Sequence, residues 1–317
     1  MDEITTLRRF NRCYTQRIGV LDDSYLDSGR PLGPSRLLFE IGPDGARVGV
    51  LRRRMSIDSG YLSRLLRQLE QDDLITVATD PADGRQRIVE LSAAGRREWR
   101  RLDRRSNEVA RSLVESLSPR HRSELAAALS AADRLMRAAT VEFDIVDPRS
   151  PAADAVLTRY FDELDKRFRS GFDRGAGGAT GAAALGTPQG AFVLMLSDET
   201  TIGCGGLQRI DDTTSEIKRM WVDPDWRGLG LGRRLLTKLE SIAIGRGRSR
   251  VVLDTNETLR EAVAMYERAG YDPIARYNDN PYAHHWFAKE LSLTSPLIAA
   301  EITKSLRPPA DATLFTK

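Results

Sequence analysis

The segment from Trp221 to Gly232, WVDPDWRGLGLG, constrains the fold of this chain most strongly. It follows an apolar strand pattern and opens a helical pattern whose Leu231, Leu235 and Leu239 face one side. Glycines 228, 230 and 232 remove side chains where successive backbone amides converge, and a helix N-terminus adds a partial positive charge. The segment therefore predicts a diphosphate-binding loop, with a purely structural role of the glycines as the alternative.

Two other phosphate-binding loops do not fit this context. No Gly-Lys-Ser/Thr follows, which excludes a P-loop, and the preceding strand is not the first of a βαβ unit, which argues against a Rossmann fingerprint. The motif from Arg227 to Gly232, within a β-α-β-β-β-α-β-α-β order, resembles the GNAT (Gcn5-related) N-acetyltransferases over residues 142–291. The resemblance implies an α/β fold with a mixed, mostly antiparallel sheet, and acetyl-CoA as cosubstrate.

The same resemblance assigns cofactor contacts. Amides of residues 227–232 would hold the pyrophosphate, the backbone of residues 220–222 would pair with pantetheine, and Asn256 would hydrogen-bond it, unless Asn256 only starts a helix. The cofactor-binding residues implied are Met220, Trp221, Val222, Arg227, Gly228, Leu229, Gly230, Leu231, Gly232 and Asn256.

Acyl transfer to an amine needs a base for the amine proton and an acid for the departing thiolate. Tyr266 matches the family tyrosine near the sulfur and is the candidate acid, while Glu216 is the candidate base. The alternatives are a core aromatic for Tyr266 and a structural partner of Lys218 for Glu216.

The polar and aromatic loop at residues 277–287 is predicted to recognise the acceptor, together with the Gly- and Ala-rich segment 171–190. The alternative is a well-capped hairpin. His284 and His285 are adjacent and would point to opposite faces of a strand, so no metal site is expected. The candidate substrate-binding residues are Phe172, Tyr277, Asn278, Asn280 and Tyr282.

The N-terminal half has the pattern of a DNA reader. Asp58 can cap a helix reaching to about Gln71, in which four leucines between 62 and 69 form one apolar stripe and leave Ser63 and Arg64 free for a major groove. A hairpin with Arg85 and Arg87 follows. This half is also the basic one, with 25 arginines and 21 acidic residues in the first 142 positions.

The run SIDSGYLSRLLRQLEQDDLI and the DPADGRQRIVELSAAG that follows resemble MarR-family winged helix-turn-helix regulators over roughly residues 1–140. The resemblance implies a homodimer, formed by the helices at 1–20 and 93–139, on a pseudo-palindromic duplex operator. The alternative is an amphipathic helix in an all-α domain. The implied DNA contacts are Ser59, Tyr61, Ser63, Arg64, Arg85 and Arg87.

The sequence thus predicts a mainly helical winged helix-turn-helix domain at 1–141, a GNAT-like domain at 142–292 and a tail at 293–317. Finer expectations are a helix at 46–53 capped by Asp44, a loop at 171–190, a helix at 227–245 and a strand near 271–277.

The predicted function is that of a transcriptional regulator that also acetylates an amine, favoured to be a small molecule. One alternative is a regulator whose GNAT domain only senses acetyl-CoA, and another is an enzyme whose winged helix only dimerises. Cys13 and Cys204 form no ligand pattern, and the absence of a long apolar run predicts a cytoplasmic protein without a membrane partner.

Overall fold

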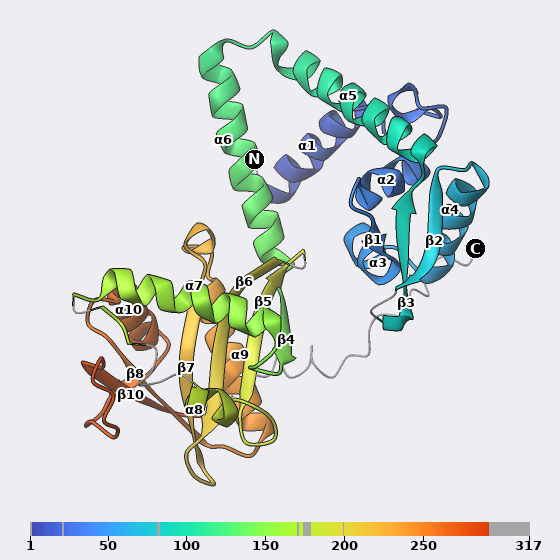
Figure 1. The fold of residues 1–317 in the computed structure, drawn as a ribbon. Coiled ribbons are helices and arrows are strands. Elements are labelled where there is room, and N and C mark those ends of the chain that lie inside the picture. Colours follow the sequence, from blue (N-terminus) through green and yellow to red (C-terminus); the bar gives the residue numbers. More distant parts are fainter. Residues whose placement is uncertain are drawn as a thin grey trace. The chain divides into compact units, whose positions relative to one another are not determined.

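The computed structural model describes residues 2–20, 22–80, 83–169, 171–173, 179–198 and 200–291 (Figure 1). The described residues form two compact units, which divide between Ala128 and Leu129. The division lies inside a helix, α6 (Pro119–Ala139), because Ala138 near its end belongs to the core of the second unit. The functional boundary at residue 141 stays a prediction.

The first unit has the winged helix-turn-helix arrangement that the sequence predicts. A three-stranded antiparallel sheet, in the order β1-β3-β2, packs with helices around a core of leucines and isoleucines (Figure 1). Its elements are α1 (Glu3–Arg17), a short 3-10 turn (Tyr25–Asp27), α2 (Leu32–Ile41), β1 (Ala46–Arg47), α3 (Val48–Met55), α4 (Ser59–Gln71), β2 (Ile75–Asp80), β3 (Asp83–Leu91) and α5 (Ala93–Glu115).

Local signals explain most of these boundaries. The carboxylate of Asp58 accepts a hydrogen bond from the Tyr61 amide at 2.8 Å and caps α4, and the four leucines of the stripe are buried. The cap expected from Asp44 is wrong. Ala46 and Arg47 pair with Val89 and Ile88 as strand β1, so the following helix begins only at Val48 and has no side-chain cap.

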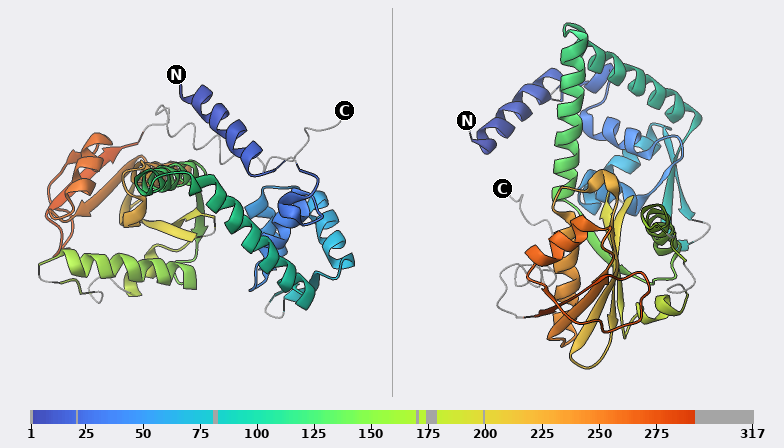
Figure 2. Two further views of the ribbon diagram at one scale, coloured as in Figure 1. Left: turned by 90° about the horizontal axis from the view of Figure 1, so that it is seen from above. Right: turned by 90° about the vertical axis from the view of Figure 1, so that its left-hand side faces the viewer.

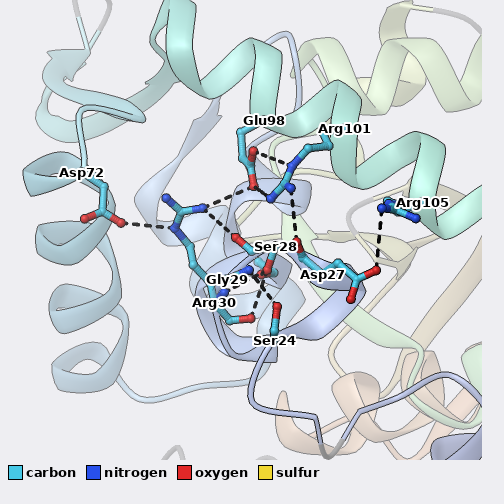
Figure 3. A network of polar contacts seen from close by, with 10 residues as sticks. Ser24, Asp27, Ser28, Gly29, Arg30, Asp72, Glu98, Arg101 and Arg105 are labelled. Carbon is cyan, nitrogen blue, oxygen red and sulfur yellow. Dashed lines mark hydrogen bonds and ion pairs between the residues drawn. The ribbon is translucent and has the colours of Figure 1, made fainter.

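A polar network fixes the start of α5 against its neighbours (Figure 3). The Arg30 guanidinium contacts Asp72 and Glu98, each at 3.2 Å, and Arg101 donates twice to Glu98 and once to the Asp27 carbonyl. These groups are half-buried, so each pair contributes on the order of 1 kcal/mol or less. The network joins the end of α4, the 3-10 turn and α5 into one rigid corner.

The second unit is a mixed α/β domain with a mostly antiparallel sheet, as predicted. The strand order is β4-β5-β6-β7-β8-β10-β9, and β7 with β8 is the parallel pair among the described strands. The elements are β4 (Glu142–Val146), α7 (Pro151–Arg167), α8 (Ala179–Ala184), β5 (Ala191–Ser197), β6 (Thr200–Arg209), β7 (Thr214–Val222), a 3-10 turn (Pro224–Trp226), α9 (Leu231–Gly245), β8 (Arg250–Thr255), α10 (Arg260–Arg268), β9 (Asp272–Pro273) and β10 (His285–Glu290).

Helices α7 and α9 cover opposite faces of this sheet (Figures 1 and 2). Neighbouring glycines of β6 show the two faces: a Cβ on Gly205 would meet Leu235 and Leu239 of α9, and one on Gly206 would meet Leu185 on the α7 side. Each face therefore has its own apolar core.

Three expectations for this unit need correction. Residues 171–190 are not one loop, because the alanines at 179–184 form the short helix α8 and Leu185 is buried. The helix expected from Arg227 begins at Leu231. The strand expected near 271–277 is reduced to Asp272 and Pro273, where proline cannot donate to a further ladder. No helix in the described ranges is long and apolar enough to cross a membrane.

Candidate functional site

The site begins where β7 and β8 separate. Their parallel pairing runs from Thr214 opposite Arg250 to Ile217 opposite Leu253. Just beyond, Arg219 has a φ of 54°, and the register of β7 against β6 shifts by one residue. This is a β-bulge, which bends a strand and re-aims the side chains near it. The last residues of β7 therefore diverge from β8 and leave a wedge between the strands.

The first cavity opens at the α9 end of this wedge and measures about 700 Å³. Gly228 and Gly230 have φ values of 79° and 74°, and an added Cβ at either would meet no atom within 4 Å. The cofactor candidates that line it are Met220, Trp221, Val222, Arg227, Gly228, Gly230, Leu231 and Gly232. Leu229 instead packs against the core, and Asn256 lines a second cavity.

The start of α9 in this cavity fits the diphosphate of acetyl-CoA, and basic side chains lie around it together with Glu163 and Glu261, which pair with Arg167. The amides in the first turn of α9 have no carbonyl of their own helix to bond. Arg167, Arg233 and Arg268 also line the cavity, and Nη1 of Arg233 is buried without a hydrogen-bond partner among the described residues. The free amides at this helix end are the groups that would hold a phosphate.

The side chain of Arg227 points back to the protein. Its Nε donates to the Val222 carbonyl at 2.9 Å, and its Nη2 donates to Glu163 at 2.6 Å. Glu163 also accepts from the Trp221 indole at 2.8 Å. Burial raises the pKa of Glu163, but the donors from Arg227 and Trp221 outweigh it and lower the pKa overall. The Arg227 side chain therefore shapes the loop, and a contact of its backbone with the cofactor stays a prediction.

The second cavity, of about 540 Å³, meets the first at a junction. Both cavities are lined by Tyr160, Leu164, Met220, Leu259, Ala262 and Tyr266. Tyr266 is 6% exposed, and its hydroxyl lies 4.0 Å from the Met220 sulfur. Burial, and next the charge of Asp254, raise the pKa of Tyr266 above its ordinary value, so the phenol keeps its proton at neutral pH.

Glu216 lies beneath the second cavity. It is buried and does not line the cavity. Its carboxylate accepts from the Tyr277 hydroxyl at 2.8 Å, the Asn278 amide at 3.2 Å, the Gln208 amide and the Lys218 ammonium at 2.8 Å. With four donors around it, Glu216 anchors the 277–282 loop to the sheet.

The predicted acceptor residues are brought together at the second cavity. Phe172, Asn278, Asn280 and Tyr282 line it, and Tyr277 lies behind them on Glu216. Asn256 is buried, and its amide donates to the Tyr282 carbonyl at 2.7 Å while its oxygen accepts from the Thr258 amide at 2.9 Å. Asn256 thus holds the loop that carries Tyr282.

Sequence reasoning missed several residues of the site, among them Tyr160, Asp254 and Arg233. Tyr160 comes from the middle of α7, where helical spacing gives no sign that it faces a cavity. Asp254 is an acidic residue one position before the end of apolar strand β8, a signal that marks the residue but does not give its role. Arg233 follows the glycine motif directly in α9.

On the first unit, α4 presents the predicted DNA contacts. Ser59, Tyr61 and Arg64 are exposed, Ser63 is half-buried, and the Arg64 guanidinium lies 5.6 Å from the Tyr61 ring centroid. Arg87 is exposed on β3, and the side chain of Arg85 lies outside the described residues. Arg67, also exposed, donates to the Ser63 carbonyl.

Groups of His, Cys, Asp and Glu that could hold a metal ion are absent from the described part of the chain. The sequence matches two family models, which confirms both resemblances over the matched ranges. Residues 157–271 match the acetyltransferase (GNAT) family, and residues 28–86 match the MarR family.

Curated relatives match the C-terminal half. An IAA acetyltransferase of Azospirillum brasilense is 29% identical over 136 residues, covering 42% of this chain and 88% of the relative. N-alpha-acetyltransferase RimI of Mycobacterium tuberculosis is 31% identical over 93 residues, covering 28% of this chain and 57% of the relative. In two other curated relatives, the match spans only 60% and 25% of the relative's length.

Solved structures are similar to each half. A GNAT family acetyltransferase from Elizabethkingia anophelis with acetyl-CoA bound has a TM-score of 0.35 at 18% identity, covering 48% of this chain and 98% of that chain. Wild-type MarR from E. coli has a TM-score of 0.36 at 16% identity, covering 42% of this chain and 97% of that chain.

Proposed function

We propose that this chain, in which a MarR-type region precedes a GNAT acetyltransferase region, binds operator DNA and transfers the acetyl group of acetyl-CoA to an amine. The observation that carries the enzymatic part is the junction of the two cavities. The cavity at the start of α9, which would hold the diphosphate, meets the second cavity at Met220 and Tyr266. Beyond this junction the second cavity has its own aromatic and polar lining. A donor and an acceptor can meet there.

The residues at the junction suit acyl transfer. When bound, acetyl-CoA supplies the acyl group and the leaving thiolate. Tyr266 holds its proton near the Met220 sulfur and can give it to a departing thiolate. The backbone amides of the diverging end of β7 are placed to stabilise a developing oxyanion. One acetyl-CoA and one neutral amine give one acetamide and one thiol, so protons and electrons balance.

In this proposal Glu216 has a positioning role. Its four donors and its place beneath the cavity separate it from the reacting atoms. It holds Lys218, Tyr277 and Asn278 in the arrangement that forms the polar end of the acceptor cavity. Loss of this carboxylate is expected to raise the KM for the amine more than it lowers kcat.

Thiol release with a panel of amines tests the proposal. Tyr266→Phe is expected to lower kcat by roughly 10²–10⁴-fold while CoA affinity, measured by calorimetry, is unchanged. Tyr271→Phe is the matched control, because Tyr271 is buried 5.9 Å from Tyr266, centroid to centroid, but lines neither cavity. Equal activity of both variants would exclude Tyr266 as the acid.

A second candidate function is a regulator whose GNAT region binds acetyl-CoA without turnover. The observation that favours it is Glu216, the expected base, which is saturated by donors and lies away from the cavity surface. Tight CoA binding without thiol release on any amine would select this candidate.

DNA binding rests on the exposed side of α4 and on its cap at Asp58. The chain is expected to bind its own upstream duplex with a strong salt dependence, and Arg64→Ala is expected to weaken binding. Arg120→Ala on α6, where the arginine pairs with Glu124, is the control. Salt-independent or undetectable binding would leave the winged helix as a dimerisation module.

A homodimer on this DNA is supported by α1. None of its residues is buried, although Ile4, Leu7, Phe10 and Tyr14 form one apolar stripe at helical spacing. A second copy would cover this stripe and place two α4 helices on half-sites roughly 34–36 Å apart. Light scattering of Leu7→Glu beside the wild type tests this arrangement.

A further inference from the structure

The second cavity differs at its two ends, and the geometry points to a class of acceptor. We propose that the acceptor is a cationic amine on a flat apolar body, with its ammonium bound by Asp254 and its body against an aromatic wall. The aromatic wall is formed by Phe161, Phe168, Phe172 and Tyr282. This inference rests on the proposed acetyl transfer and names its substrate.

The aromatic wall is a continuous set of rings. Phe161 stacks on Phe172 with centroids 5.5 Å apart and planes 13° apart, and Phe172 lies 4.7 Å from Tyr282. Phe168 contacts both Phe172 and Tyr282 within 6 Å. All four line the second cavity. Stacked rings favour a planar apolar ligand, which buries its face against them with the offset geometry that aromatic pairs prefer.

Two backbone hydrogen bonds hold this wall in place. The Asp173 amide donates to the Tyr282 hydroxyl at 2.8 Å, and the Phe172 amide donates to Asp165 at 2.9 Å. The Arg219 guanidinium lies 5.7 Å from the Phe161 centroid and extends the flat surface, since guanidinium groups stack on rings. The wall therefore exists before a ligand arrives.

The polar end of the cavity has an unbalanced charge. Asp254 accepts from the amides of Asn278 at 2.5 Å and Asn280 at 3.1 Å, which are neutral donors. Its nearest described cation, the Lys218 ammonium, lies 3.6 Å away and is closer to Glu216, at 2.8 Å. Two carboxylates share this ammonium, and the other basic side chain that lines the cavity, Arg219, lies against the Phe161 ring, so a ligand cation could pair with Asp254.

Asp254 is also a carboxylate that lies close to the junction of the two cavities. It lines the acceptor cavity, whereas Glu216 does not, and its charge acts on both phenols of the junction, Tyr160 and Tyr266. Asp279, the other lining carboxylate, is fully exposed and pairs with Arg276. An ammonium on Asp254 would thus stand beside the point where the acyl group is expected, and it would lose one proton to solvent before the neutral nitrogen attacks.

The test measures amine binding to the full chain saturated with CoA, by calorimetry. The probes are 2-phenylethylamine, the neutral 2-phenylethanol and the small aliphatic cation n-propylamine. Wild type is expected to bind 2-phenylethylamine most tightly. Asp254→Asn should weaken that binding by roughly tenfold to a hundredfold, while Asp279→Asn should leave it unchanged.

A third variant has the opposite expected sign. Lys218→Gln removes the shared ammonium and is expected to tighten binding of 2-phenylethylamine, whereas general damage to the fold would only weaken it. The inference is overturned if Asp254→Asn binds the amine as wild type does, if 2-phenylethanol binds equally well, or if n-propylamine does.

Thiol release separates this inference from the proposed function. Turnover of other amines, but not of aromatic ones, would overturn the acceptor class and leave acetyl transfer intact. Tight, Asp254-dependent binding of 2-phenylethylamine without any thiol release would support the acceptor site and remove the transferase activity.

Discussion

Replacing Gly230 with alanine tests the proposed diphosphate cradle most directly. Gly230 caps the start of α9 with a φ of 74°, in the left-handed region that alanine enters at a cost of about 1–2 kcal/mol. An added Cβ meets no protein atom within 4 Å, so the methyl group would project into the open cavity. It would occupy space that a phosphate oxygen needs.

The two effects can be separated by a matched control. Gly247, near the other end of α9, has a φ of 75° and equally open surroundings, but it lines neither cavity. Both variants should therefore lose about 1–2 kcal/mol of unfolding free energy, measured by denaturant titration. Only Gly230→Ala should weaken CoA binding, by roughly tenfold or more if one amide contact to a charged phosphate is lost.

Calorimetry with CoA decides the outcome. If both variants bind CoA as tightly as the wild type does, the cradle is refuted, because the ligand then does not use the space beside Gly230. A similar loss of affinity in both would point to a global change in α9 instead. The cradle is supported only if both variants lose the same unfolding free energy and only Gly230→Ala loses CoA affinity.

Three further predictions concern stability. Asp58→Ala should cost about 1 kcal/mol, because it removes the cap of α4, and denaturant unfolding should show the loss with no change in slope. Arg30→Met, which removes the Arg30 contacts to Asp72 and Glu98 but leaves Glu98 paired with Arg101 (Figure 3), should cost about 1 kcal/mol, with a smaller loss at high salt. An equal loss at both salt concentrations would contradict an ionic contribution. Burial raises the pKa of the tyrosines at 25, 160, 266, 271 and 277. Their neutral phenols therefore contribute stability below pH about 10, and this stability is lost as the pH rises further. Tyrosinate absorbance should then rise together with unfolding, and two separate transitions would contradict this prediction.

The elements with strong local signals were predictable from the sequence. The leucine stripe of α4 and its Asp58 cap appear as expected, as do the apolar strands β5 to β8. Weaker signals failed where a long-range contact decided the outcome. Asp44 looked like a cap, but the pairing of Ala46 with Val89, far along the chain, made the segment a strand. Local patterns do not contain such a partner.

The candidate site shows the same division. The glycines of the first cavity could be read from their spacing before a helix, since backbone conformation is a local property. Asp254 and Tyr160 could not be assigned, because their role depends on how far β7 diverges from β8 and on which side of α7 faces the gap. Glu216 was found as a residue, but its four donors come from three separate segments and changed its role.

The extra residue in β7 sets which way its neighbours point. Lys218 lies opposite Gly206 and Trp221 lies opposite Cys204, so three steps along β7 match two along β6, and all four positions face α7 and Leu185. In a regular strand, residues three apart would face opposite sides. Removing one residue between Lys218 and Trp221 would therefore turn every later side chain of β7 from one face of the sheet to the other. Engineering of this scaffold should thus keep the length of that stretch unchanged.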